Sequence, residues 1–476
     1  MHAGIPEPTA WMVLPFLLLL LAIALGPLAW PQGWHRHYPK VALGLGAVTL
    51  LYYGLGLGAV GRIVQTAHEY LSFLALIGSL FVVSGGIHIT LRGQATPASN
   101  VLFLSAGAVV ANVLGTTGAA MLLIRPWLRM NRYRLTAHHV VFFIFIVANV
   151  GGCLTPIGDP PLFLGYLKGI PFWWVLEHCW PMWLVGVGSL LGIFYVLDRR
   201  NFLRAPAPVR DRETGAGEQW RIQGLHNLPF LGIILASVFL QHPPLLREVL
   251  LVVAAVGSYV TTPRALHEAN DFNFEPIREV GILFLGIFAT MMPALDWLQR
   301  HAGELGLATP GLFYWATGFL SCWLDNAPTY LSFLSAEMGL FAPAEVVGAI
   351  QAALDPAATN ALPPGGFSPA AVQAALEVLR EHFASEVATG QVSVDHVLVA
   401  ELLGLPVYHR YLAAIAVGAV FFGACTYIGN GPNFMVKNIA EQQKAHVPSF
   451  LGYIARFTVP FLLPVLTLVW WFFFRG

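Results

Sequence analysis

Long apolar runs recur from one end of the chain to the other, separated by shorter polar stretches. Each run has about 20 residues, the length of a helix that crosses a hydrocarbon core of roughly 30 Å. Backbone N–H and C=O groups in lipid need partners within their own segment, so these runs are predicted to be helices. The alternation that is typical of barrel strands is absent. The pattern therefore predicts an all-α integral membrane protein.

Ten of these runs are predicted to be transmembrane helices. The first five lie at about 11–30, 40–60, 70–91, 137–165 and 172–197, and the second five at about 226–242, 245–263, 279–298, 411–430 and 449–473. Two further apolar stretches, 100–125 and 310–337, contain Gly, Pro, Thr and Asn near their middle. We predict two re-entrant hairpins there, because irregular backbone at membrane depth persists only where it lines a cavity.

The composition agrees with a membrane location. Apolar residues make up 57% of the chain and charged residues 11%, against about 25% charged in soluble domains. The net charge is zero, so bulk charge indicates no nucleic-acid partner. The four cysteines contain no CxxC pair, and they predict neither a disulfide framework nor a zinc site. The lipid bilayer is the expected partner.

Charge also predicts which loops face the cytoplasm. The linker 201–225 and the stretch 125–134 are rich in arginine, which places both on the cytoplasmic side by the positive-inside rule. The segment 338–409 is acidic, with few basic residues. We predict that it is an extracytoplasmic insertion in the second half of the chain, containing a helix that starts at Ser368-Pro369.

A repeated motif divides the chain into two halves. Residues 153–163 match residues 425–434, and five of the nine positions from Thr155 and Thr426 onward are identical. Upstream, Asn112 in one hairpin matches Asn326 in the other. We predict a first repeat at 1–200 and a second at 226–473, each with five crossings and one hairpin. Five is an odd number, so the second copy is expected to be inverted relative to the first.

The predicted helices 137–165 and 411–430 contain a break at this motif. Gly158 and Gly429 let the backbone turn, and the prolines that follow stop the helix from continuing. A half-helix offers N–H groups to an anion, while unwound carbonyls can coordinate a cation. The side chains of Thr155, Thr426, Asn430 and Asn433 add neutral oxygens and amides near the breaks.

Two acids lie inside these motifs. Asp159 follows the first break and Asp325 lies in the second hairpin. An ionisable group at membrane depth costs roughly 2.5–3.5 kcal/mol on insertion scales, so each is a functional candidate. The alternative is that each caps a broken helix or pairs with a neighbour. Glu69 and Glu279 are expected to be ordinary acids at helix starts.

Histidines offer a second possible chemistry. His88, His138 and His139 lie near predicted helix ends and could relay protons. Histidines in such positions are more often interfacial residues that reach the polar headgroup region.

The motifs Gly151-Gly152-Cys153-Leu154-Thr155-Pro156-Ile157-Gly158-Asp159 and Leu324-Asp325-Asn326-Ala327-Pro328 resemble those of the ion transporter superfamily. The first is most similar to its sodium/proton antiporter branch. The sequence Gly115-Thr116-Thr117-Gly118-Ala119 is more similar to its citrate transporter branch. The resemblance covers roughly residues 40–473, apart from the insertion. It implies an ion-coupled carrier of the inner (plasma) membrane that forms a homodimer and moves its hairpin domain like an elevator.

The resemblance also implies a binding site at the hairpin tips and helix breaks. By it, ions or substrate are bound by Asn112, Thr116, Thr117, Asn326, Thr329, Thr155, Gly158, Thr426, Gly429 and Asn430. Adding Asp159, Asp325 and Asn433 completes the predicted site, with sodium at Asp159, Asp325, Asn112 and Asn326. The hairpin tips differ from the Ser-Asn-Thr tips of the symporters, which argues against direct carboxylate binding.

Two transport functions follow as hypotheses. The first is sodium/proton antiport, with Asp159 and Asp325 as coupling carboxylates and no cofactor beyond the ions. The second is cation-coupled transport of citrate or another di- or tricarboxylate. A non-transporting scaffold or a membrane enzyme is disfavoured, because duplicated helix breaks serve neither and no catalytic triad or Walker loop is present.

Overall fold

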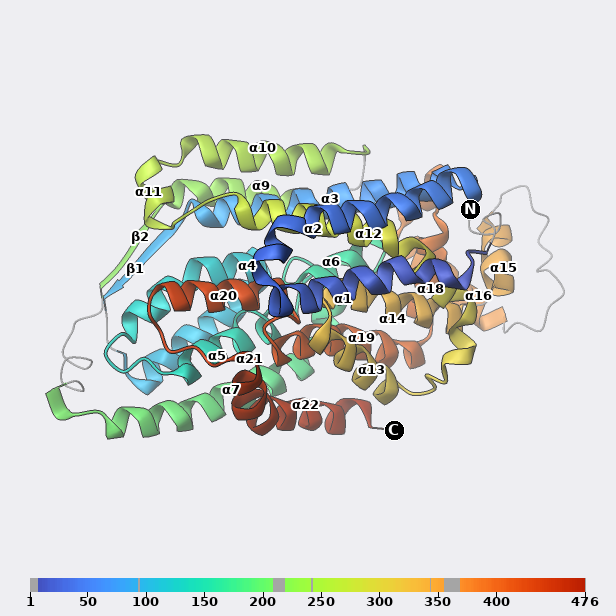
Figure 1. Ribbon diagram of the computed structural model, residues 1–476. Helices are drawn as coiled ribbons and strands as arrows, with labels where there is room; N and C mark the ends of the chain where they lie inside the picture. Colours follow the sequence, from blue (N-terminus) through green and yellow to red (C-terminus); the bar gives the residue numbers. More distant parts are fainter. Residues whose placement is uncertain are drawn as a thin grey trace.

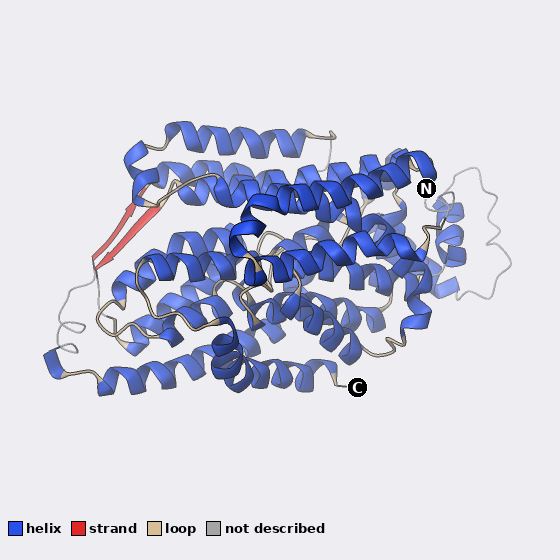
Figure 2. Cartoon of the chain, viewed as in Figure 1, coloured by secondary structure: helices blue, strands red, loops and turns tan. Residues whose placement is uncertain are grey.

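A computed structural model describes residues 7–92, 95–208, 219–240, 243–342, 344–354 and 369–475, and the chain is almost entirely helical (Figures 1 and 2). Its first half comprises α1 (Leu14–Ala29), α2 (Pro31–Leu51), α3 (Val60–Gly85), β1 (His88–Arg92), α4 (Pro97–Met130), α5 (Ala137–Ile146), α6 (Pro160–Leu167) and α7 (Trp174–Arg204). This confirms the predicted all-α class.

The second half begins with β2 (Gln219–Gln223), α9 (Leu228–Val238), α10 (Leu246–Thr261), α11 (Arg264–Ala269) and α12 (Glu275–His301). It continues with α13 (Pro310–Trp323), α14 (Asn326–Phe341), α15 (Ala344–Leu354), α16 (Pro369–His382), α17 (Ala384–Thr389) and α18 (Val394–Gly404). It ends with α19 (Pro406–Phe422), α20 (Gly431–Gln442), α21 (Phe450–Tyr453) and α22 (Leu463–Val469). Ser368, the expected N-cap of α16, lies outside the described residues.

Seven helices in the described ranges are long and apolar enough to cross a membrane, or eight if one bent pair counts as a span. They include α3, α4, α7 and α12. The ten crossings, the two repeats and their inversion stay predictions, because length and composition alone do not place a helix in the bilayer.

The helices form two packed groups (Figure 1). One group, drawn along the top, contains α2, α3, α9, α10 and α12; the other contains the broken helices, both hairpins, α7 and α22. Packing between the two halves of the chain is reciprocal. Helix α2 packs on α12 while α10 packs on α3, and α6 packs on α14 while α20 packs on α4. A twofold-related pair of units would produce this exchange of partners.

Helix α4 folds back on itself as a hairpin. Its helical backbone breaks at Gly115, which has φ 73° and ψ 157°, a conformation that is nearly restricted to glycine. The two ends of α4 meet, since Asn100 Nδ2 donates to Asn131 Oδ1 at 2.8 Å and Asn131 Nδ2 donates to Asn100 Oδ1 at 3.2 Å. The segment 100–125 predicted as a hairpin therefore lies within two antiparallel arms.

Helices α13 and α14 form the corresponding pair in the second half. They are joined by Leu324 and Asp325. The rings of Phe313 and Phe333 pack between the two helices, with their centroids 6.2 Å apart. The insertion helices α15, α16 and α18 gather at one end of the molecule, and the β1–β2 sheet lies at the other (Figure 1). The predicted extracytoplasmic insertion and the predicted cytoplasmic linker are thus well separated.

The structure corrects several sequence boundaries. Residues 88–92 form a strand that pairs with 219–223, although 70–91 was expected to be one helix and 201–225 only a linker. The second broken helix does not end at residue 430, because α20 extends from Gly431 to Gln442. Glu69 does not begin a helix: α3 begins at Val60, so Glu69 lies inside it and is 7% exposed.

Candidate functional site

The two helix breaks share one local geometry. Thr155 Oγ1 accepts from the Gly158 N–H at 3.1 Å, and Thr426 Oγ1 accepts from the Gly429 N–H at 3.1 Å. Each threonine also donates to a carbonyl near a hairpin tip: Thr155 to Asn112 O and Thr426 to Cys322 O, both at 2.6 Å. The repeated motif therefore has a physical role, since its threonine closes the turn and joins it to the neighbouring hairpin.

The first hairpin tip is bonded to the first break through backbone groups. The Thr116 N–H donates to Gly158 O at 2.7 Å. Asn112 Nδ2 donates to Gly151 O at 2.7 Å, and Asn112 Oδ1 accepts from the Leu154 N–H at 2.8 Å. Both polar atoms of the Asn112 side chain thus hold the break, and its role as a sodium ligand stays a prediction.

Asp159 lies where all four interrupted elements meet. Its side chain is 1% exposed and receives three hydrogen bonds. Thr116 Oγ1 donates to Oδ1 at 2.6 Å, Asn430 Nδ2 donates to Oδ1 at 3.1 Å, and Asn326 Nδ2 donates to Oδ2 at 2.6 Å. These donors come from the first hairpin, the second break and the second hairpin, so the structure brings together four of the predicted site residues.

Helix N-termini also converge on this centre. Asp159 and Asn430 are the N-cap residues of α6 and α20, and neither side chain caps its own helix. Instead the two side chains bond to each other. The arm after Gly115 and helix α14 begin at Thr116 and Asn326. The partial positive charge at four helix starts favours an anionic group at the centre, which is why a buried carboxylate is tolerated there.

A small cavity of about 20 Å³ opens beside Asp159. Its walls are the first hairpin tip, the first break and one face of α3, where Leu76, Leu80 and Phe81 lie. Thr117 lines it as well. A space of this size holds an ion or about one water molecule. A solute as large as citrate would need α3 and the hairpin tip to separate.

One acceptor beside Asp159 is unused. Among the described residues, Asn326 Oδ1 is buried and accepts no hydrogen bond, while the amide nitrogen of the same side chain donates to Asp159. A buried carbonyl-type oxygen without a donor is costly, and sodium is a hard cation that prefers oxygen ligands. Asp159 and Asn326 therefore offer oxygens that fit the predicted sodium site.

The remaining predicted residues lie around this centre without reaching Asp159. Asp325 Oδ1 accepts from the Ala327 N–H at 3.0 Å and so caps α14. Capping was the alternative to a functional role for this acid. Thr329 Oγ1 donates to Asp325 O at 2.9 Å. Asn433 Nδ2 donates to the carbonyls of Gly423 and Thr426. These side chains shape the second break and hairpin.

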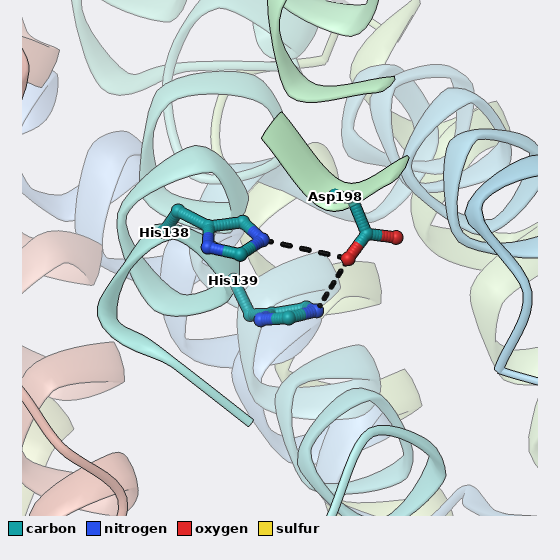
Figure 3. A group of neighbouring side chains, drawn as sticks. All are labelled: His138, His139 and Asp198. Atoms are coloured by element: carbon teal, nitrogen blue, oxygen red, sulfur yellow. Dashed lines mark hydrogen bonds and ion pairs between the residues drawn. The ribbon is translucent and has the colours of Figure 1, made fainter. Parts of the chain in front are cut away.

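A second polar cluster lies at the start of α5, where His138 and His139 face Asp198 (Figure 3). Three such ligands could in principle hold a metal. However, Arg134 already forms a buried ion pair with Asp198, and a bound cation would lie beside its positive charge. His139 Nδ1 accepts from the Thr136 N–H at 3.2 Å, so the neutral ring carries its proton on Nε2, the atom that faces Asp198 at 3.0 Å. These three side chains therefore do not fit a metal ion. The two histidines bond to Asp198 and not to Asp159, so they lie outside the central site.

A buried ionic cluster joins the insertion to the rest of the molecule. Lys168 Nζ lies 2.7 Å from Glu69 Oε1 and 3.1 Å from Asp395 Oδ2. Gln65 Nε2 donates to the same two carboxylates. We call these four residues the latch; they link α3, the C-cap of α6 and α18. Nearby, Arg62 pairs with Asp296 between α3 and α12. Sequence reasoning missed both, because the partners are far apart in the chain.

Comparison with known proteins places the chain in a family. Two curated relatives are uncharacterized transporters of Mycobacterium tuberculosis, from strain CDC 1551 / Oshkosh and strain ATCC 25618 / H37Rv. Each is 27% identical over 256 residues, which cover 50% of this chain and 58% of the relative. A family model described as "putative citrate transport" matches residues 6–474. The chain is therefore a multi-pass membrane protein that belongs to this family.

Proposed function

We propose that the protein is a cation-coupled secondary transporter of citrate or a related carboxylate, with the coupling cation bound at Asp159. The observation that carries the proposal is the buried Asp159 carboxylate with the unpaired Asn326 Oδ1 beside it. The family description supports the carboxylate. Helix starts around the centre would favour the anionic solute once the cavity opens, and the bound cation would balance its charge. We also propose an inner-membrane location and a homodimer.

Sodium/proton antiport is the second candidate. It is favoured by the buried Asp159, by a second acid, Asp325, at the neighbouring hairpin tip, and by a cavity that has room for an ion but not for citrate. A carboxylate can hold sodium when ionised and a proton when neutral, so the two ions would compete for it.

Reconstitution in liposomes separates the two candidates. Uptake of labelled citrate that depends on an inward sodium or proton gradient supports the first candidate. Proton release on sodium addition, with no citrate flux, supports the second and refutes the first. Asp159→Asn should abolish either activity, because the cation loses its charged ligand. Full activity of this variant would show that the cation binds elsewhere.

A further inference from the structure

Asn149 connects the two broken helices, although it belongs to no motif. It follows α5 just before the first break and is fully buried. Its Nδ2 donates to Ile144 O at 2.8 Å in its own helix and to Asn433 Oδ1 at 2.6 Å in the second broken helix. The aligned position in the second repeat is Phe421, so the second repeat has no amide at this position.

Asn433, which follows the second break, fixes the orientation of the Asn149 amide. Asn433 Nδ2 donates to Gly423 O at 2.8 Å and to Thr426 O at 2.9 Å. Carbonyls only accept hydrogen bonds, so the oxygen of Asn433 must face the other way, toward Asn149. The NH2 group of Asn149 donates to this oxygen, and Asn149 Oδ1 remains as an acceptor.

That remaining acceptor faces Asn430. Asn430 Nδ2 lies 3.2 Å from Asn149 Oδ1, 3.2 Å from Ala148 O and 3.1 Å from Asp159 Oδ1. An amide NH2 has two hydrogens; one points to Asp159 and the other is shared by the two acceptors near residue 149. The acceptors therefore hold Asn430 with its NH2 group toward Asp159 and its oxygen away from it.

We propose that Asn149 is a positioning residue for the coupling-cation site, acting through Asn430 on Asp159. This inference rests on the proposed function in taking Asp159 as the cation ligand. With Asn149 in place, the empty carboxylate keeps its third donor, and the cation must compete with it. Without Asn149, the Asn430 amide loses one of the two acceptors that orient it. The carboxylate is then less well stabilised when empty and binds the cation more tightly.

The first test is spectroscopic and needs no transported solute. The infrared carboxylate band of Asp159, assigned by difference from Asp159→Asn, should shift in Asn149→Leu and in Asn430→Leu. The double variant should show no more than the shift of Asn430→Leu alone, since one residue acts through the other. Asn227→Leu, which removes an equally buried amide elsewhere, should leave the band in place. An unmoved band in Asn149→Leu would overturn the inference.

The second test is kinetic. In liposomes, Asn149→Leu should lower the sodium concentration for half-maximal transport, because it weakens the bond from Asn430 to the Asp159 carboxylate. The fall should be at most about tenfold, the effect of losing one hydrogen bond to a charged group completely. Asn227→Leu should change only the amount of folded protein. An unchanged or raised half-saturation in Asn149→Leu would overturn the inference. Absence of transport by the unmodified protein would instead refute the proposed function, and the infrared result would still decide the role of Asn149.

Discussion

Lys168→Met is expected to destabilise the protein strongly, because it removes the ammonium group that lies between two largely buried carboxylates. The side chains of Glu69 and Asp395 are 9% and 13% exposed. Their oxygens lie at most 5.8 Å apart, the sum of the two distances from Lys168 Nζ, 2.7 Å and 3.1 Å. At an effective dielectric constant of about 20, two like charges at that separation repel by about 3 kcal/mol. Measured losses on removing one partner of a buried pair are about 3–5 kcal/mol.

Denaturant unfolding in detergent, followed by tryptophan fluorescence, measures this loss. Lys437→Met is the matched control, because Lys437 pairs with Glu441 at a similar 2.8 Å, but with side chains 22% and 48% exposed. An exposed i,i+4 pair contributes only about 0.3–0.5 kcal/mol. Adding Glu69→Gln to Lys168→Met should restore part of the stability, since it removes the repulsion between the two carboxylates. If Lys168→Met and Lys437→Met lose the same stability, the reasoning about the latch is wrong.

Three further predictions concern the site and its surroundings. Asp325→Asn should keep both the cap of α14 and the stability of the protein but reduce transport at least about tenfold. Asp325→Ala should in addition lower the free energy of unfolding by about 1 kcal/mol. Full transport by the asparagine variant would show that Asp325 only caps the helix. Gly115→Ala should cost about 1–3 kcal/mol in denaturant unfolding because of its positive φ, whereas Gly188→Ala, in open space within a helix, should be neutral or slightly stabilising. Zinc should not raise the thermal unfolding midpoint, since His139 Nδ1 is already engaged; a rise would indicate a metal site.

Much of the central site could be predicted from the sequence, because the signals were local. A glycine followed by prolines within an apolar run indicates a helix break, and an acid beside it indicates a site. These rules identified Asp159 and Asn430, whereas Thr116 and Asn326 entered the predicted site through the resemblance to the ion transporter superfamily. The same reasoning also overlooked a signal: Asn149 is a lone amide in the apolar run from residue 137 to 150, and a polar residue at such depth needs a partner.

Other features depend on contacts that no local pattern encodes. The Lys168 pairs span 99 and 227 residues of sequence, so no local pattern identifies Lys168 as the partner of these acids. Glu69 was expected to begin a helix, because the polar residues before it suggested a loop; in the structure those residues continue α3. The strand pairing of 88–92 with 219–223 joins the two halves of the chain, which short polar segments do not reveal.

Helix α6 connects the two centres of charge in the molecule. Its N-cap is Asp159 and its C-cap is Lys168, and eight helical residues span about 12 Å. A rigid-body movement of α6 away from α3 would draw Lys168 away from Glu69. Any such movement would therefore open the latch. Because Asp395 belongs to the insertion, the latch joins the insertion to α6 and α3 directly, so the insertion is more than a surface cap.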